Sequence, residues 1–70
     1  MNQQELGQRI RTICRQLCAE KPSLRTGHNP TGAKAMAVYN HCTRNEPTIM
    51  RHMSRYYSGQ DPYQVFKRWV

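Results

Sequence analysis

Apolar residues recur along the start of the chain at the spacing of one helical face. The stretch from Asn2 to Glu20 contains no proline and one glycine. Its apolar residues follow an i, i+4, i+7 pattern: Leu6, Ile10, Ile13, Cys14 and Leu17. This spacing confines them to a narrow arc of an α-helix and places Arg11 and Arg15 on the opposite side. The pattern predicts an amphipathic helix over 2–20, which Pro22 ends.

The next segment predicts a loop and then a second helix. Residues 23–28 are typical of a loop, in which we expect Leu24 to anchor into the core and the tip to be mobile. Asn29 and Pro30 form a start signal, because asparagine is a good N-cap and proline suits the first helical position. The helix that follows is rich in alanine, and its core-facing residues share one side: Ala35, Val38, Tyr39 and Cys42. We expect it to end near Thr43.

A third helix is predicted over 46–58. Asn45 or Thr48 is expected to cap it, Pro47 is tolerated in its first turn, and Gly59 with the preceding serine closes it. One side of this helix is apolar: Ile49, Met50, Met53, Tyr56 and Tyr57. The other side is polar and basic: Thr48, Arg51, His52 and Arg55. The pattern therefore separates a core face from a free face.

The start signal of a fourth helix is the strongest in the chain. Asp61 is a good N-cap, Pro62 takes the first helical position, and Gln64 completes a capping box. The apolar residues that follow are Val65, Phe66 and Trp69. Lys67 and Arg68 point away from them.

Together these elements predict an all-α fold, a single small domain of four helices over 1–70. No alternation of apolar and polar residues is long enough for a strand, and no internal repeat occurs. We expect Phe66 and Trp69 to complete the core that Leu17 and the rest of the apolar face of the first helix begin. A chain of 70 residues buries only about 60% of the surface that it exposes when unfolded. A homodimer or a bound partner would add buried area.

The charge balance marks this small bundle as a basic domain. Eight arginines and three lysines face four acids, which gives a net charge of +7. Three of the acids, Glu5, Glu46 and Asp61, lie at predicted helix starts, where negative charge meets the positive end of the helix dipole. The remaining positive charge favours a polyanion or an acidic protein surface as partner. The excess of arginine over lysine favours planar recognition of phosphate, base or carboxylate.

The segment from Ala35 to Gly59 resembles a helix-turn-helix. An alanine-rich helix leads through a polar turn at 43–45 into a helix with a basic face. The family has a glycine at this turn and a small apolar residue after it, whereas this chain has Thr43 and Arg44. In that family the second helix enters the major groove of DNA. The resemblance implies DNA contacts from the third helix and the turn before it: Arg44, Thr48, Arg51, His52 and Arg55. It also implies contacts to the DNA backbone from the two flanking helices: Arg11, Arg15, Lys67 and Arg68.

Two classes of function are compatible with this charge. The first is a transcription regulator that binds double-stranded DNA. The second is a protein that inhibits or adapts an acidic protein partner through its basic face, as small phage and mobile-element proteins do by analogy. RNA binding through the same face is a third and weaker alternative. Arg51 and Arg55 are also compatible with an ordinary solvated face, but such faces mix acids with bases, whereas residues 21–70 carry eight bases and two acids.

Metal binding and catalysis find little support in the sequence. Side chains of the types that bind zinc are present: Cys14, Cys18, His41, Cys42 and His52. Their spacing differs from that of a zinc knuckle, because Cys14 and Cys18 are one helical turn apart, and adjacent residues such as His41 and Cys42 point about 100° apart on a helix. There are no paired carboxylates and no nucleophile with an orienting base and acid. We therefore expect no enzyme activity, no metal and no cofactor.

Two features of the sequence bear on the cellular compartment of the protein. No apolar run approaches the roughly 18 residues of a membrane span, and the N-terminus lacks the basic and then apolar order of a signal peptide. We expect a cytoplasmic protein, or a nuclear one in a eukaryote. Three cysteines cannot all pair, so we expect reduced thiols that pack as small apolar groups.

Overall fold

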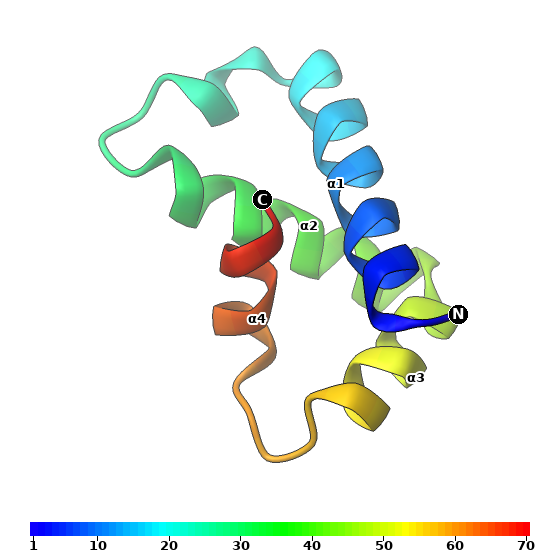
Figure 1. Cartoon of the computed structure of the whole chain (residues 1–70). Coiled ribbons are helices and arrows are strands. Elements are labelled where there is room, and N and C mark those ends of the chain that lie inside the picture. The colour runs from blue at the N-terminus through cyan, green and yellow to red at the C-terminus, as the bar shows by residue number, and fades with distance from the viewer.

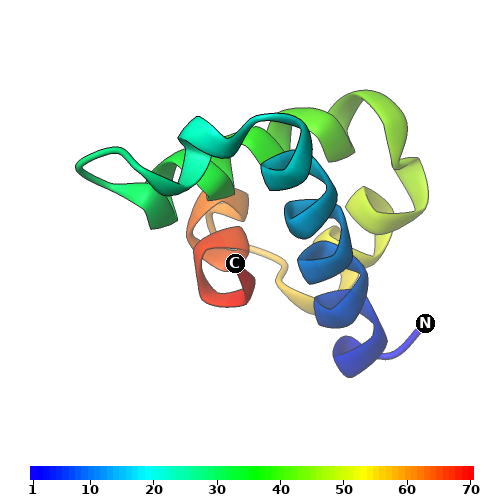
Figure 2. The ribbon, with the colours of Figure 1, turned by 90° about the horizontal axis from the view of Figure 1, so that it is seen from above.

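The computed structural model describes residues 1–70 and is all-α, as the sequence predicts, with no strand. Its elements in chain order are α1 (Gln3–Glu20), the short 3₁₀ helix η1 (Pro22–Arg25), α2 (Pro30–Asn45), α3 (Pro47–Tyr56) and α4 (Pro62–Trp69). In Figure 1, α1 and α4 lie in front of α2, and α3 lies near the start of α1. Figure 2 shows the same arrangement from above, with α2 on one side and α1 and α4 on the other.

Short polar side chains cap three of the four α-helices. Asn29 Oδ1 accepts a hydrogen bond from the Gly32 amide at 3.0 Å, and Asp61 Oδ1 accepts one from the Tyr63 amide at 3.0 Å, so both predicted caps are confirmed. Asn2 caps α1 in the same way, through the Glu5 amide. Asp61 accepts from the second helical residue and not from Gln64, and Gln64 makes no hydrogen bond to the Asp61 amide, so the predicted capping box is not formed.

The junction between α2 and α3 differs from the prediction. Asn45 is the last residue of α2 and Glu46 takes the cap position without a side-chain cap bond, so the prediction that Asn45 or Thr48 caps α3 is wrong. Pro47 disfavours a helical backbone at the residue before it, which places the break at Glu46. Asn45 stays helical, and its side-chain amide donates to the His41 carbonyl oxygen at 3.2 Å. For the same reason α2 extends past Thr43.

The two polar loops are also more regular than expected. The segment after α1 forms η1 within the predicted loop, and Leu24 packs half-buried against the core as expected. At the other end, α3 stops at Tyr56, before the predicted residue 58. Gly59 then closes the turn with a φ of 80°, a left-handed backbone that glycine adopts without the clash of a Cβ.

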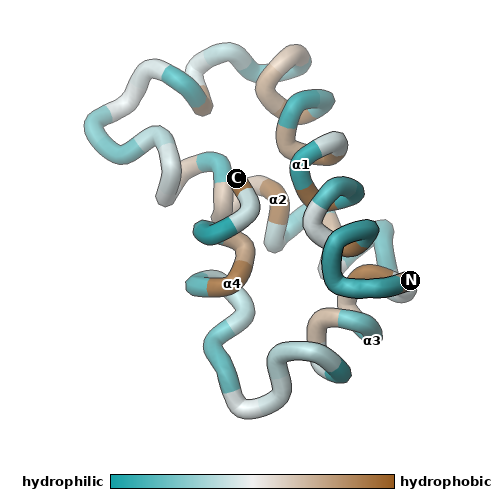
Figure 3. Tube along the Cα trace, in the orientation of Figure 1, coloured by the Kyte–Doolittle hydropathy of each residue, from teal (hydrophilic) through white to brown (hydrophobic).

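The core is one apolar cluster to which all four α-helices contribute. Figure 3 shows the apolar stretches of the trace in each helix, separated by polar ones. Twelve residues are buried in this cluster: Leu6, Ile10, Ile13, Cys14, Cys18, Ala35, Val38, Cys42, Ile49, Met53, Val65 and Phe66. The ring of Phe66 stacks on Tyr39 with centroids 5.7 Å apart. No helix combines the length and the apolar character that crossing a membrane requires.

The residues predicted to join α1 and α4 in the core are buried to different extents. Phe66 is fully buried, as predicted, but Trp69 and Leu17 are only half-buried. Trp69 is the last residue of α4 and reaches the flank of α1, where its ring lies against Gly7. Val65 is the second fully buried residue of α4, and Trp69 packs at the edge of the core against α1, so Phe66 and Trp69 both contribute to the core that the first helix begins.

Candidate nucleic-acid interface

The free side of α3 carries the predicted polar and basic residues. Ile49 and Met53 are buried against the core, which turns the opposite side of the helix to solvent. Thr48, Arg51 and Arg55 are exposed there. None of these three side chains has an ion-pair partner. We call the exposed residues of this side, together with His52 and the exposed Arg44 at the end of α2, the α3 surface.

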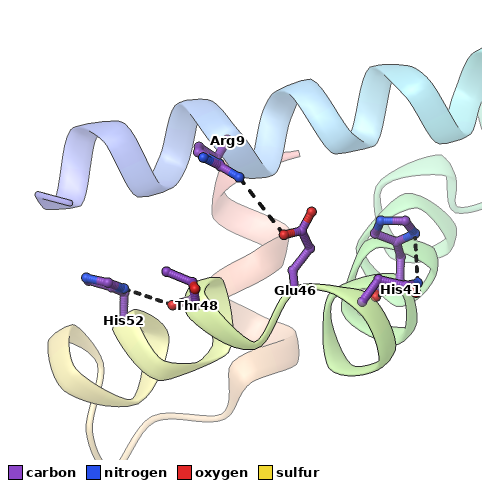
Figure 4. A network of polar contacts seen from close by, with 6 residues as sticks. Arg9, His41, Glu46, Thr48 and His52 are labelled. Carbon is purple, nitrogen blue, oxygen red and sulfur yellow. Dashed lines mark hydrogen bonds and ion pairs between the residues drawn. The ribbon is translucent and has the colours of Figure 1, made fainter.

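His52 is held against its own helix. Its Nδ1 lies 2.8 Å from the carbonyl oxygen of Thr48, and because a carbonyl only accepts, this nitrogen carries a proton. The ring also lies 6.2 Å from the ring of Tyr56, and the Tyr56 hydroxyl donates to the carbonyl of Met1. Figure 4 shows His52 beside Thr48 on α3. The contacts fix the imidazole and leave Nε2 as the atom that can meet a ligand.

A single ion pair ties α1 to the junction of α2 and α3. Arg9 Nη2 lies 4.0 Å from Glu46 Oε2, and Figure 4 shows this contact bridging the two segments. Both side chains are partly exposed, so the contribution of the pair to stability is small. Glu46, the acid closest to Thr48 in the chain, is thus directed toward Arg9.

The connection between α2 and α3 is shorter than the predicted polar turn. Thr43, Arg44 and Asn45 are all helical, so Glu46 is the one residue between the two helices. A helix-turn-helix joins its helices by a turn of about three or four residues. The prediction of a turn at 43–45 is therefore wrong, because the break induced by Pro47 falls later in the chain.

Arg11 and Arg15 lie on a different surface from α3. Arg11 Nε donates to the Trp69 carbonyl oxygen at 3.1 Å, and its guanidinium carbon lies 5.3 Å from the centre of the Trp69 ring. Residues two apart in a helix point about 200° apart. Arg9 therefore faces the α3 side of α1, while Arg11 faces the α4 side. The predicted position opposite the core is corrected to this flank, next to α4.

The two predicted basic residues of α4 lie away from α3 as well. Arg68 is exposed, and its Nη2 donates to Gln60 Oε1 at 3.2 Å. Lys67 is half-buried, with Nζ 5.5 Å from the centre of the Tyr63 ring. The structure thus brings together five of the nine predicted residues on the α3 surface. The other four lie on α1 and α4: Arg11, Arg15, Lys67 and Arg68.

Sequence reasoning missed two basic residues, Arg25 and Lys34. They line a pocket with Arg11 and Arg15, between α1, η1, α2 and the end of α4. Neither residue belongs to a local motif, since one lies in the predicted loop and the other on the polar side of an alanine-rich helix. Only the fold of the chain back on itself places them together.

The three cysteines are free and buried, as expected for Cys14 and Cys42. Burial, together with the nearby negative charge of Glu46, raises the pKa of Cys42 to about 11. Burial and the neighbouring thiol of Cys18 raise the pKa of Cys14. These thiols are therefore protonated at neutral pH. No group of three histidine, cysteine or acidic side chains lies close enough together to hold a metal ion.

Comparison with protein-family models, curated proteins and solved structures finds no match for this chain. Any function must therefore be argued from the α3 surface and the charges of the structure.

Proposed function

We propose that this chain is a small nucleic-acid-binding domain that places α3 in the major groove of double-stranded DNA, as a transcription regulator does. The observation that carries the proposal is the pair Arg51 and Arg55. They lie one turn apart on the solvent side of α3, exposed and without an ion-pair partner. Arginine makes bidentate hydrogen bonds to guanine in the major groove, which makes this pair suited to base contacts.

The dimensions and the charge of α3 support this placement. An α-helix with its side chains is about 10 to 12 Å across, and the major groove of DNA is about 12 Å wide and admits one α-helix. Thr48 lies one turn before the two arginines, where its hydroxyl can reach a base or a phosphate. Arg44, at the end of α2, is placed for a phosphate beside the groove. The net charge of +7 supplies attraction that does not depend on sequence.

The short connection at Glu46 distinguishes this arrangement from the predicted helix-turn-helix. In our proposal, α2 crosses the DNA backbone and α3 enters the groove, at an angle set by the break before Pro47. The proposal needs a free, basic helix face and does not depend on a turn of standard length. Arg11 and Arg15 have no part in this contact, because they lie on the flank of α1 that faces α4.

The test compares two substitutions that remove the same charge from different surfaces. A preferred duplex is first selected from a random pool. Arg51→Gln is expected to weaken binding to that duplex by about 1 to 3 kcal/mol and to relax discrimination at one base position. Lys67→Gln, on α4, is the matched control and is expected to leave discrimination unchanged. Binding is measured by fluorescence anisotropy with selected and scrambled duplexes.

Each other outcome argues against base contacts from α3. Equal, sequence-independent losses from both substitutions would mean that α3 contacts phosphates only. Unchanged binding in the Arg51 variant would remove α3 from the interface. Binding to a structured RNA in preference to the duplex would move the function to RNA recognition, in which a deep and narrow major groove excludes side chains.

A further inference from the structure

A second concentration of positive charge surrounds a pocket on the far side of α1 from α3. The pocket has a volume of about 230 Å³ and lies between α1, η1, α2 and the end of α4. Figure 1 shows the ribbons of these four segments, with the C-terminus in front of α2. Four basic side chains line it, and no acidic side chain does: Arg11, Arg15, Arg25 and Lys34.

Three of these four cations have no partner in the chain. Arg15, Arg25 and Lys34 make no ion pair and donate no side-chain hydrogen bond, whereas Arg11 is bound to the Trp69 carbonyl. They come from three different elements, so the fold itself gathers them. Like charges at a partly enclosed site repel one another, and an anion bound between them would relieve this repulsion.

The floor of the pocket consists of thiols. Cys14 and Cys18 are buried there, one helical turn apart. Burial and Cys18 raise the pKa of Cys14, while the charges of Lys34 and Arg25 act on it in the opposite direction. Arg25 on η1 and Lys34 on α2 line the pocket from different elements. The raised pKa of Cys14 keeps this thiol protonated and uncharged at neutral pH, so it does not neutralise the nearby cations.

Trp69 lines the pocket and is already in contact with two residues of α1. Its ring lies against Gly7 and beneath the guanidinium of Arg11. A nucleobase would have to displace these contacts in order to stack on it. The pocket is therefore suited to a ligand held by charge and hydrogen bonds.

We propose that this pocket binds a phosphate group. A phosphate monoester carries about two negative charges near neutral pH and presents three acceptor oxygens. A carboxylate brings one charge, which matches a site of four cations less well. Three of the four cations are arginines, and their planar donors can each bond two phosphate oxygens. The group belongs either to the end of a nucleic-acid strand or to a small phosphorylated molecule.

This inference goes beyond the proposed function, because no residue of the α3 surface takes part. The first experiment uses the intact ¹⁵N-labelled protein and titrates it with pyrophosphate, with chloride at matched ionic strength as the reference. We expect saturable shifts at the Trp69 indole and at the side chains of Arg15 and Arg25. Shifts that do not saturate, or that chloride reproduces, would overturn the proposal.

Matched variants then locate the bound anion. Lys34→Gln and Arg25→Gln are each expected to weaken pyrophosphate binding at least about tenfold, since each removes a charged hydrogen bond. Arg55→Gln removes the same charge from the α3 surface and is expected to leave pyrophosphate binding unchanged, although it weakens the proposed DNA contact. Circular dichroism checks that each variant is folded. Equal losses in all three variants would reduce the effect to general attraction by a basic protein and overturn the pocket assignment.

A final comparison distinguishes the two sources of phosphate. Single-stranded oligonucleotides are measured with a 5′-phosphate and with a 5′-hydroxyl. Tighter binding of the phosphorylated strand, lost in Lys34→Gln, identifies a strand end as the ligand. Equal binding of both strands, with pyrophosphate still saturating the pocket, identifies a small phosphorylated molecule. An oligoglutamate peptide that displaces pyrophosphate from the pocket and binds more tightly would overturn the proposal in favour of an acidic protein partner.

Discussion

At the scale of single residues, Gly7 allows the last residue of α4, Trp69, to pack closely on α1. A Cβ at this position would overlap the indole ring of Trp69, so glycine is what allows the ring to lie on the helix. Arg11 completes the contact by donating to the Trp69 carbonyl, one of the carbonyls that a helix end leaves without an internal partner. The end of α4 is therefore fixed by one small residue and one arginine.

Gly7→Ala is expected to displace Trp69 and to destabilise the domain. Alanine favours a helix over glycine by about 1 kcal/mol, but overpacking against a ring costs about 1 to 3 kcal/mol. We expect a red shift of tryptophan emission and a lower urea midpoint. Trp69 is the single tryptophan of the chain, so the signal has one source. Gly27→Ala is the control, because nothing lies near its added methyl group. Unchanged emission in the Gly7 variant would contradict the contact.

Cys42 is expected to make stability fall at alkaline pH. Its pKa rises from 9.0 when exposed to about 11 in the fold. The stability that the protonated thiol contributes is fully present below pH 9 and is lost as pH rises through about 11. Because alanine does not titrate, we expect the Cys42→Ala variant to lose less stability at alkaline pH than the unmodified protein, by on the order of 1 kcal/mol. Urea unfolding under reducing conditions, at neutral pH and at high pH, gives the loss of unfolding free energy for the unmodified protein and for the variant. An identical loss in both proteins would contradict the role of Cys42.

At the scale of elements, α4 closes the core although it has only eight residues. It packs against both α2 and α1. Phe66 and Val65 are fully buried, and the Phe66 ring stacks on Tyr39 of α2. No other element covers this side of the cluster.

Phe66→Ala is expected to cost about 3 to 5 kcal/mol, which is comparable with the total stability of a small domain. Truncation before Asp61 is then expected to unfold the chain. Arg68→Ala, on the exposed side of the same helix, is the control and should leave the thermal transition almost unchanged. The measurement is the melting curve followed by circular dichroism. A truncated chain with an unaltered transition would show that the core closes without α4.

Features that depend on residues close together in the chain were predicted from the sequence, whereas contacts between distant residues were not. Asn29 and Asp61 cap their helices as predicted, because a cap and the proline after it act within four residues. The α2–α3 junction was misplaced by a few residues, because the break at Glu46 depends on Pro47 outweighing a plausible asparagine cap. The partial exposure of Trp69 was not predicted, because its ring packs on Gly7, a contact that no local pattern reports.

At the scale of the whole molecule, the positive charge forms two separate surfaces. The α3 surface lies on one flank of α1, and the pocket with Arg25 and Lys34 lies on the other. The sequence shows how many charges there are and on which side of each helix they lie, and from this one basic binding face was predicted. It does not show how α1 is rotated about its axis between α3 and α4. The positions of Arg9 and Arg11 show that rotation, one directed toward Glu46 and the other toward Trp69.

The salt dependence of duplex DNA binding measures how much α3 contributes to the interaction with DNA. A synthetic duplex with 5′-hydroxyl ends is titrated at several salt concentrations, so that no terminal phosphate can enter the pocket. Each phosphate contact contributes about 0.9 to the slope of log affinity against log salt. We expect tight binding at low salt, and a slope that is smaller by about one or two when Arg44 and Arg55 are both replaced by glutamine.

The matched control replaces Arg15 and Arg25 by glutamine, which removes the same two charges from the pocket. We predict that this variant keeps the slope of the unmodified protein, while the α3 variant loses part of it. Absence of binding at low salt, or a slope reduced only by the pocket variant, would contradict the claim that α3 carries the interaction with DNA.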